Sequence, residues 1–235
     1  MEKTNDTENV NNSEKFYDTK TNSIKWIDID NWERKELLNT YIKTDFPYII
    51  ITANICVTKP LQYAKKHGIS FNRVMIYLCT KTIDQIPNYR YRFIDGKPFI
   101  IDHSRPIATH LFKPQNVLGM VECPWPCNNI IEFCQQSHFE SSNNIITGER
   151  TSGKLDYISF TSIPWIEYTS FIRTISHNGT DNVPKISFGK YFKDKIEKDK
   201  IWMPVSSQTH HGLMDGYHVG LFYTNLQKAC SELKI

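Results

Sequence analysis

The densest group of residues that can exchange protons or bind ligands lies near the C-terminus, in residues 208–218. It holds three histidines and one carboxylate together with two glycines: His210, His211, Gly212, Asp215, Gly216 and His218. Histidine titrates near neutral pH and can take a proton from a hydroxyl or thiol, and an aspartate four positions on can orient it or hold the loop. The pattern predicts an enzyme with a histidine base.

Two other interpretations of this stretch stay open from the residues alone. One histidine can be a core residue while Asp215 only caps a helix. His211 and Asp215 can also bind a metal from one helix face, although Gly212 disfavours a helix there and a clear third ligand is missing. Cys123 and Cys127 likewise lack a matching second pair, and six cysteines in 235 residues lack the density of a disulfide framework. We predict no metal site and reduced thiols.

Composition narrows the class of protein. The chain has 40% hydrophobic and 23% charged residues, which is typical of a globular domain, and a net charge of +3 without a basic run argues against nucleic acid. Residues 1–22 are polar and predict a disordered leader before a single domain at 23–235. No apolar run approaches the roughly 20 residues that cross a bilayer, and no secretion signal precedes the domain. We expect a cytoplasmic protein without a membrane segment.

The histidine-rich stretch lies between a predicted strand and a predicted helix, and the rest of the chain alternates between the two. Apolar periodicity and capping residues predict helices at 31–41, 58–68, 71–86, from 128 or 129 to 139, and 217–233. β-Branched and alternating segments predict strands at 24–29, 48–57, 107–112, 117–122, 156–161, 168–176, 185–191 and 201–207, with a hairpin at 91–101, a flexible loop at 141–153 and a charged hairpin tip at 192–200. This mixture predicts an α/β fold, a two-layer sandwich in which helices pack on one large mixed sheet.

Four segments carry a resemblance to a known family. Residues 210–219 resemble the HHxxxDG signature of the chloramphenicol acetyltransferases, a signature that other CoA-dependent acyltransferases share. Residues 28–36 resemble the family's N-terminal Asn-Trp-x-Arg motif, 162–165 its Pro-Trp segment, and 189–191 the strand end before its hairpin. These segments occur in the family's order, and the resemblance covers about residues 23–233. It implies the CoA-dependent acyltransferase fold.

The resemblance also implies catalytic roles. His211 would be the general base that takes the proton of an acceptor hydroxyl as this attacks the thioester of acetyl-CoA. Asp215 would pair with Arg34 and hold the loop. Thr161 stands where the family has a serine that donates to the oxyanion. Because neighbours on a strand point to opposite faces, only one of Thr161 and Ser162 can face the site, and the alignment favours Thr161.

The resemblance also implies a co-substrate, the residues that contact it, and an assembly. Acetyl-CoA is the implied co-substrate, with Trp165, Ser187, Lys190 and Tyr191 on its side of the site. Family members are homotrimers whose site lies between subunits, and drug resistance is the implied role.

The acceptor side fits the family less closely. Tyr41 matches a family tyrosine of the acceptor pocket, whereas Ile49, Leu118 and Arg173 replace other pocket residues. A cation in an apolar pocket is costly unless it is paired or meets an acidic ligand. The resemblance as a whole implies O-acetylation of chloramphenicol or a similar small alcohol. The alternatives are a different, possibly acidic, acceptor, or a binding module of the same fold without turnover.

Overall fold

The computed structural model describes residues 22–112, 117–136, 145–146, 154–175 and 180–235. Most of its strands form one large mixed sheet with the order β10-β11-β9-β8-β5-β6-β7, and β2 also pairs with β11. β8 runs parallel to β5 and β9, whereas the other pairs are antiparallel. The strands are β2 (Tyr48–Cys56), β5 (Arg105–Phe112), β6 (Val117–Glu122), β7 (Ile145–Ile146), β8 (Tyr157–Ser162), β9 (Lys185–Phe188), β10 (Phe192–Lys193) and β11 (Ile201–His210).

A smaller antiparallel sheet joins the N-terminal strand to a hairpin, in the order β1-β4-β3. Its strands are β1 (Ile24–Trp26), β3 (Tyr91–Ile94) and β4 (Lys97–Ile101). The hairpin turns at Asp95 and Gly96, whose φ angles of 49° and 76° fall in the left-handed region that an Asp-Gly turn uses. The hairpin predicted from this dipeptide is therefore confirmed.

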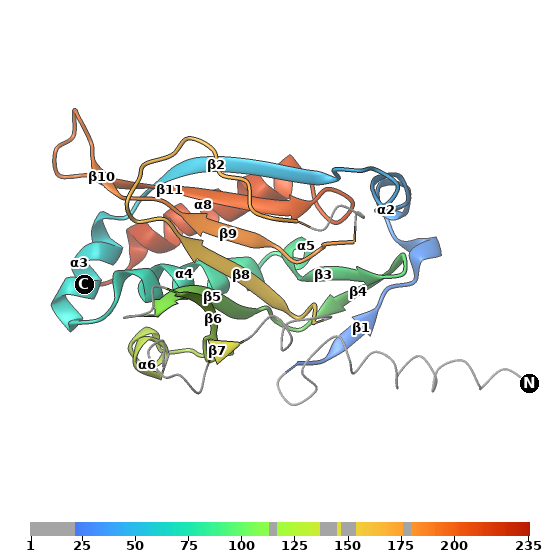
Figure 1. Ribbon diagram of the computed structural model, residues 1–235, viewed down its shortest axis with the longest axis horizontal. Helices are drawn as coiled ribbons and strands as arrows, with labels where there is room; N and C mark the ends of the chain where they lie inside the picture. The colour runs from blue at the N-terminus through green and yellow to red at the C-terminus, as the bar shows by residue number, and fades with distance from the viewer. Residues whose placement is uncertain (1–21, 113–116, 137–144, 147–153, 176–179) are drawn as a thin grey trace, which may run out of the picture.

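The helices are η1 (Ile29–Asn31), α2 (Lys35–Tyr41), α3 (Thr58–His67), α4 (Phe71–Asp84), α5 (Pro87–Arg90), α6 (Ile130–Gln136) and α8 (Gly216–Glu232). Figure 1 shows α4 and α8 behind the large sheet, so that the sheet and its helices form two layers. Buried residues of both helices, such as Val74 and Phe222, share one apolar core with Phe160 and Phe188 of the sheet. The predicted α/β sandwich is confirmed.

The two faces of the large sheet differ because side chains alternate along each strand. Phe160, Phe188 and Val205 point into the helix-covered core. Their neighbours Thr161 and Ser187 are register partners, and Ser187 in turn pairs with Ser206, so the three hydroxyl side chains form a row on the opposite face. We refer to the face that carries Ser159, Thr161, Ser187, Ser206 and Gln208 as the open face.

Residues 168–175 are not the strand that their aromatic and β-branched composition predicts. They cross the open face, in front of the strands in Figure 1, and each of the following hydrogen bonds joins them to a strand through a side chain and not through a backbone ladder. Tyr168 donates its hydroxyl to Ser187 O, Ser206 Oγ donates to Phe171 O, and Arg173 N donates to Gln208 Oε1. The apolar composition of this segment reflects packing on the sheet.

Several element boundaries also differ from the sequence prediction. β1 ends at Trp26, and the helix predicted for 31–41 begins only at Lys35 because Trp32 has extended backbone angles after η1. Asp28 caps η1 by accepting from Asp30 N. The leader at 1–22 and the loop at 141–153 fall mainly on residues outside those described, and β11 extends past 207 to His210.

Candidate active site

The turn between β11 and α8 begins with His211. Its backbone N–H donates to Pro47 O at 2.7 Å, and its ring Nδ1 lies 3.0 Å from the carbonyl oxygen of Met214. A carbonyl only accepts hydrogen bonds, so this contact favours the proton on Nδ1 and leaves Nε2 with a lone pair. The ring of Tyr41, the last residue of α2, stacks on the imidazole with centroids 4.3 Å apart and planes 11° apart. The Met214 carbonyl and the Tyr41 ring thus orient the imidazole of His211 and leave its Nε2 able to accept a hydrogen bond.

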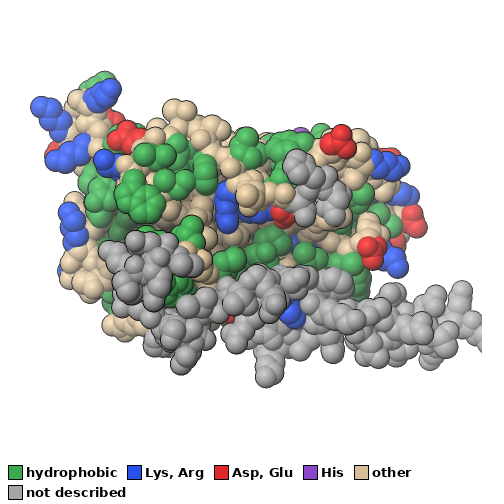
Figure 2. Space-filling model, in the orientation of Figure 1, with side chains coloured by type: hydrophobic (Ala, Val, Ile, Leu, Met, Phe, Trp, Pro, Cys, Tyr) green, Lys and Arg blue, Asp and Glu red, His purple; other side chains and the backbone are tan. Residues whose placement is uncertain are grey.

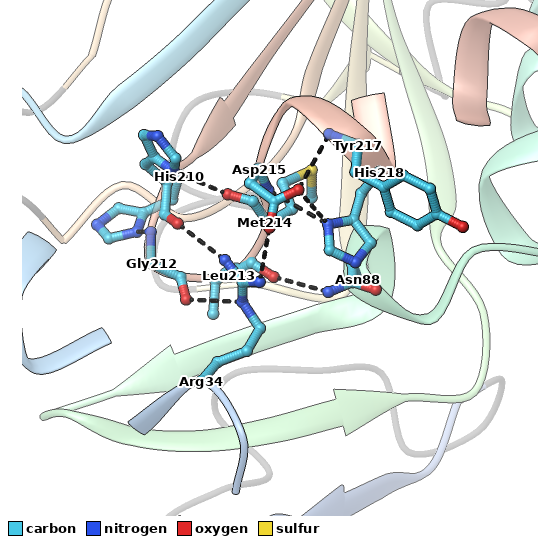
Figure 3. Close-up of polar contacts among 10 residues, drawn as sticks. Arg34, Asn88, His210, Gly212, Leu213, Met214, Asp215, Tyr217 and His218 are labelled. Carbon is cyan, nitrogen blue, oxygen red and sulfur yellow. Dashed lines mark hydrogen bonds and ion pairs between the residues drawn. The ribbon is translucent and has the colours of Figure 1, made fainter. Parts of the chain in front are cut away.

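Arg34 holds this turn through three hydrogen bonds. Its guanidinium donates to His211 O, to Gly212 O and to the carboxylate of Asp215, each at 3.2 Å. Figure 3 shows the side chain of Arg34 reaching the backbone of Gly212. Arg34 is only 5% exposed, and charge-assisted bonds from a buried cation are strong. Arg34 and Asp215, the residues predicted to pair, therefore lie together. The Arg34 guanidinium bonds to the backbone of the turn and not to the ring of His211.

Asp215 is the N-cap of α8. Its carboxylate accepts from Tyr217 N at 3.0 Å and lies 3.0 Å from His218 Nδ1, while its backbone N–H contacts the same ring in a capping box. Burial alone would raise the pKa of the Asp215 carboxyl, but the Arg34 hydrogen bond, His218 and the Tyr217 N–H outweigh it and lower that pKa. Asp215 therefore joins the helix start to Arg34.

His210 has a different environment from His211. It is 2% exposed and packs edge-on against Phe93 and Tyr48, with ring centroids 5.0 and 5.8 Å away. Its Nδ1 accepts from Gly212 N at 3.1 Å. A Cβ on Gly212 would lie 3.1 Å from this ring and 3.1 Å from the Cα of Leu38, so the close approach favours glycine. His210, the first histidine of the pair, is therefore a packed core residue.

Thr161 lies on the open face near the end of β8. Its hydroxyl is 2.7 Å from that of Thr109 on the neighbouring strand β5, and its register partner Ser187 is 2% exposed. Ser162 points to the opposite face, where its hydroxyl donates to Asn72 of α4 at 2.7 Å. Of the two adjacent hydroxyls, Thr161 is the one on the face that the helices leave uncovered.

Within one chain, Thr161 and His211 lie far apart. Thr161 pairs with Ser187 and Ser187 pairs with Ser206, and His211 lies five residues beyond Ser206 along β11. At about 3.3 Å per residue this is roughly 16 Å along the strand, in addition to two strand spacings of about 4.8 Å. The two residues of one chain cannot act on the same atom.

The residues predicted on the CoA side lie together at one end of the sheet. Trp165 is 68% and Tyr191 45% exposed, and Lys190 donates its backbone N–H to Ile166 O at 2.8 Å, which joins the two segments. Tyr191 packs edge-on against Phe71 at the start of α4, 5.6 Å between centroids. Figure 2 shows hydrophobic side chains gathered on this part of the surface. A flat exposed aromatic surface next to a lysine suits a ligand with apolar and anionic parts.

The predicted acceptor residues Tyr41, Ile49, Leu118 and Arg173 are spread over four places. Tyr41 contacts His211, as described above. Ile49 packs against the core under the helices, and Leu118 on β6 is 69% exposed. The structure therefore does not gather Ile49 and Leu118 around His211 within one chain.

Arg173 lies on the open face near Thr161. Its guanidinium donates to Ser159 O at 2.9 Å and to Ser159 Oγ at 2.8 Å, and its backbone N–H donates to Gln208 Oε1 at 2.9 Å. Sequence reasoning singled out Arg173 but missed Ser159 and Gln208. Ser159 lies between the buried apolar residues Ile158 and Phe160, which is a visible signal, whereas Gln208 lies between the polar residues Ser207 and Thr209. The strand order that brings Ser159 and Gln208 together is not readable from one sequence.

The structure also bears on other classes of site. The described part of the chain holds no group of three His, Cys, Asp or Glu side chains placed to bind a metal. Burial raises the pKa of the Cys134 thiol to about 12, with Arg73 opposing the shift and Cys127 adding to it, which disfavours a thiolate ligand. Among the described helices, none is long and apolar enough to span a bilayer.

Comparison with known proteins places the chain in a family. The family model for chloramphenicol acetyltransferase matches residues 22–227. A chloramphenicol acetyltransferase of Staphylococcus aureus is 30% identical over 213 residues, covering 86% of this chain and 93% of the relative. Chloramphenicol acetyltransferase 2 of Escherichia coli is 26% identical over 219 residues, covering 88% of this chain and 97% of the relative.

Solved structures agree with this assignment. A chloramphenicol acetyltransferase superposes with a TM-score of 0.78 at 25% identity, covering 88% of this chain and 99% of that one. The cubic core of the pyruvate dehydrogenase multienzyme complex shares the fold alone, with a TM-score of 0.58 at 11% identity. This chain belongs to the chloramphenicol acetyltransferase family, whose members are acyltransferases that use acetyl-CoA as co-substrate.

Proposed function

We propose that this protein transfers the acetyl group of acetyl-CoA to a hydroxyl of chloramphenicol or of a similar small alcohol, with His211 as the general base. The observation that carries the proposal is the contact between His211 Nδ1 and Met214 O, because it leaves Nε2 free to accept a proton. Arg34 and Tyr41 keep the ring in that orientation.

The reaction is a direct attack without an acetylated enzyme. Nε2 of His211 takes the acceptor proton while the hydroxyl oxygen forms a bond to the thioester carbonyl carbon. The tetrahedral oxyanion collapses, the carbon–sulfur bond breaks, and the departing sulfur takes the proton from the imidazolium. The products are the acetate ester and CoA thiol.

Thr161 is the proposed donor to the oxyanion. Its hydroxyl can donate only one proton, and its partner Thr109 lies at 2.7 Å. When Thr161 donates to the oxyanion, the Thr109 hydroxyl donates to Thr161, so the donor stays oriented before the reaction begins. Ser162 cannot take this role while it bonds to Asn72 on the helix side.

The site is proposed to lie between subunits of a homotrimer. Support comes from the separation of roughly 16 Å along β11 between His211 and the row that holds Thr161, since five residues at about 3.3 Å each divide them. A second copy can supply the missing half, with His211 from one subunit and Thr161 from its neighbour.

Acetyl-CoA is proposed to lie along Trp165, Lys190 and Tyr191, with its thioester near Thr161 and Ser187. The exposed rings suit the apolar pantetheine arm, and the ammonium suits a phosphate. Because acyl-CoA thioesters are made and used inside cells, we place the reaction in the cytoplasm. Residues 23–235 would form this catalytic domain and residues 1–22 a leader without a part in the chemistry.

The test is release of CoA thiol from acetyl-CoA, followed with a thiol reagent, with and without chloramphenicol. We expect release that depends on an alcohol and is lost in His211→Ala. Release with other alcohols but not with chloramphenicol would keep the mechanism and discard the drug. No release with any alcohol would sink the enzyme proposal and leave a binding module of this fold.

A further inference from the structure

The open face holds a cation that the proposed chemistry does not use. Arg173 is partly buried, and within the described part of the chain no carboxylate forms an ion pair with it. Its two side-chain hydrogen bonds both go to Ser159, to the carbonyl oxygen and to the hydroxyl. Burial lowers the pKa of Arg173, with Tyr157 and Asp181 opposing the shift, yet a guanidinium stays protonated at neutral pH.

A second cation lies close by and takes the neighbouring carboxylate. Lys185 Nζ is 2.5 Å from Asp181, and their side chains are 11% and 18% exposed. Burial lowers the pKa of Lys185, the Asp181 carboxylate opposes that shift, and the like charge of Arg173 adds to it. Among the described residues, Asp181 thus forms its ion pair with Lys185 and forms none with Arg173.

Hydrogen-bond donors also exceed acceptors around Arg173. The Nε2 of Gln208, whose Oε1 holds the Arg173 backbone, is buried without a hydrogen-bond partner among the residues that the structure describes. A buried donor without a partner costs free energy, as does an uncompensated buried charge. One additional anionic acceptor would give the Nε2 of Gln208 a hydrogen-bond partner and would compensate the charge of Arg173.

The position of Arg173 relates it to the reacting centre. It binds Ser159, which lies two residues before Thr161 on the same face of β8, so their Cα atoms are about 6.6 Å apart at about 3.3 Å per residue. Figure 2 shows basic side chains, with acidic atoms near them, at the middle of this face between hydrophobic surfaces. A ligand whose hydroxyl lies near Thr161 can therefore reach Arg173 with a second group that is several bonds from that hydroxyl.

We propose that Arg173 binds a carboxylate of the acceptor, so that the enzyme acetylates hydroxy acids in which the hydroxyl and the carboxylate are about 7 Å apart. This inference rests on the proposed acetyl transfer. Arg173 is a specificity-determining residue, Gln208 and Ser159 position it, and the bidentate geometry of guanidinium and carboxylate favours this acid over a point anion. The competing role is structural, in which Arg173 only fastens the segment 168–175 to β8.

Two probes of equal size test the charge. 4-(Hydroxymethyl)benzoate carries a hydroxyl and a carboxylate at opposite ends of one ring, and 4-(hydroxymethyl)benzamide is its neutral counterpart. Binding of both is measured by calorimetry, and kcat/KM by thiol release. We expect the full-length protein to prefer the benzoate by about 30-fold, the scale of a charge-assisted hydrogen bond. In Arg173→Leu that preference should vanish while the benzamide changes less than about threefold.

Two further variants separate recognition from structure. Ser159→Ala removes the side-chain partner of Arg173 but keeps the charge, so the preference for benzoate should persist. The double variant Asp181→Asn with Lys185→Met removes the neighbouring ion pair as a unit, and it should alter the preference far less than Arg173→Leu. If Arg173→Leu fails to fold, Arg173→Gln replaces it, because Gln can keep one bond to Ser159 O without the charge.

The outcomes distinguish this inference from the proposed function. Equal affinity of the wild-type protein for both probes, or an equal loss for both in Arg173→Leu, overturns the carboxylate site. Acetylation of chloramphenicol and of the benzamide without any preference for benzoate overturns it too, while acetyl transfer stands. Benzoate binding that depends on Arg173 without thiol release supports the carboxylate site and contradicts the enzyme proposal.

Discussion

Arg34 and Asp215 are 181 positions apart in the chain, and their side chains form an ion pair of 3.2 Å. The same guanidinium holds the carbonyl oxygens of His211 and Gly212. The turn that carries the proposed base is therefore fastened to the N-terminal segment, and the site forms only when the two ends of the chain meet.

The ion pair predicts a pH dependence of stability. Because the folded-state pKa of Asp215 is lowered, its contribution is present above the unfolded pKa of about 3.9 and is lost as pH falls through the lower folded pKa. Asp215→Asn should lower the free energy of unfolding by about 1 kcal/mol at pH 7, a small value because the carboxylate is 37% exposed. Urea unfolding should show the difference shrinking below about pH 4. Asp30→Asn, which breaks an exposed pair with Lys35, is the control and should change stability less.

The two adjacent histidines should separate catalysis from packing. His211→Ala should lower kcat roughly a thousandfold or more, while acetyl-CoA binding by calorimetry stays nearly unchanged. His210→Ala should instead lower the free energy of unfolding by about 2 kcal/mol, since it removes a buried ring and its bond to Gly212 N. A similar loss of rate in both variants, with unchanged stability, would show that His211 is not the base.

The adjacent hydroxyls of Thr161 and Ser162 on β8 should also differ, one affecting catalysis and the other only stability. Thr161→Ala should lower kcat about a hundredfold, the usual effect of losing one oxyanion donor, and Thr161→Ser should keep it. Ser162→Ala is the matched control, because its hydroxyl bonds to Asn72 on the helix side and should affect stability only. Unchanged kinetics in Thr161→Ala would assign the oxyanion to another donor.

Mixed assemblies test whether the site is shared between subunits. His211→Ala and Thr161→Ala chains are each nearly inactive, but unfolding and refolding them together should pair an intact His211 with an intact Thr161 of a neighbour. For equal amounts and random assembly, about a quarter of the sites should recover full activity. Activity that stays at the sum of the separate variants would place both residues of a site in one chain.

Gly212, which lies between the ring of His210 and α2, should tolerate no side chain. Gly212→Ala brings a Cβ to 3.1 Å from the His210 ring and from the Leu38 backbone, and we expect a loss of about 1–3 kcal/mol in stability. Gly220→Ala is the control within α8, where nothing lies within 4 Å, and it should raise stability by about 0.5–1 kcal/mol. Thermal unfolding of the two variants should shift in opposite directions.

The sequence by itself determined the features that depend on short stretches of chain. The Asp95-Gly96 turn, the Gly68 C-cap of α3, the Asp215 N-cap of α8 and the apolar faces of the helices are local signals, because turn angles and capping bonds involve residues a few positions apart. The resemblance in residues 210–219 placed His211 and Asp215 together for the same reason. Residues 168–175 show the limit, since their strand-like composition came from packing on the open face.

Only the tertiary structure decided which distant residues meet. The order of the strands placed Ser159, Gln208 and Arg173 in one cluster and set His211 roughly 16 Å along β11 from the row of Thr161, at about 3.3 Å per residue. Strand register depends on pairing between segments far apart in the chain, and a single sequence contains no direct record of that pairing. The separation of His211 from Thr161, and the place of Arg173 beside Ser159, are therefore properties of the folded chain.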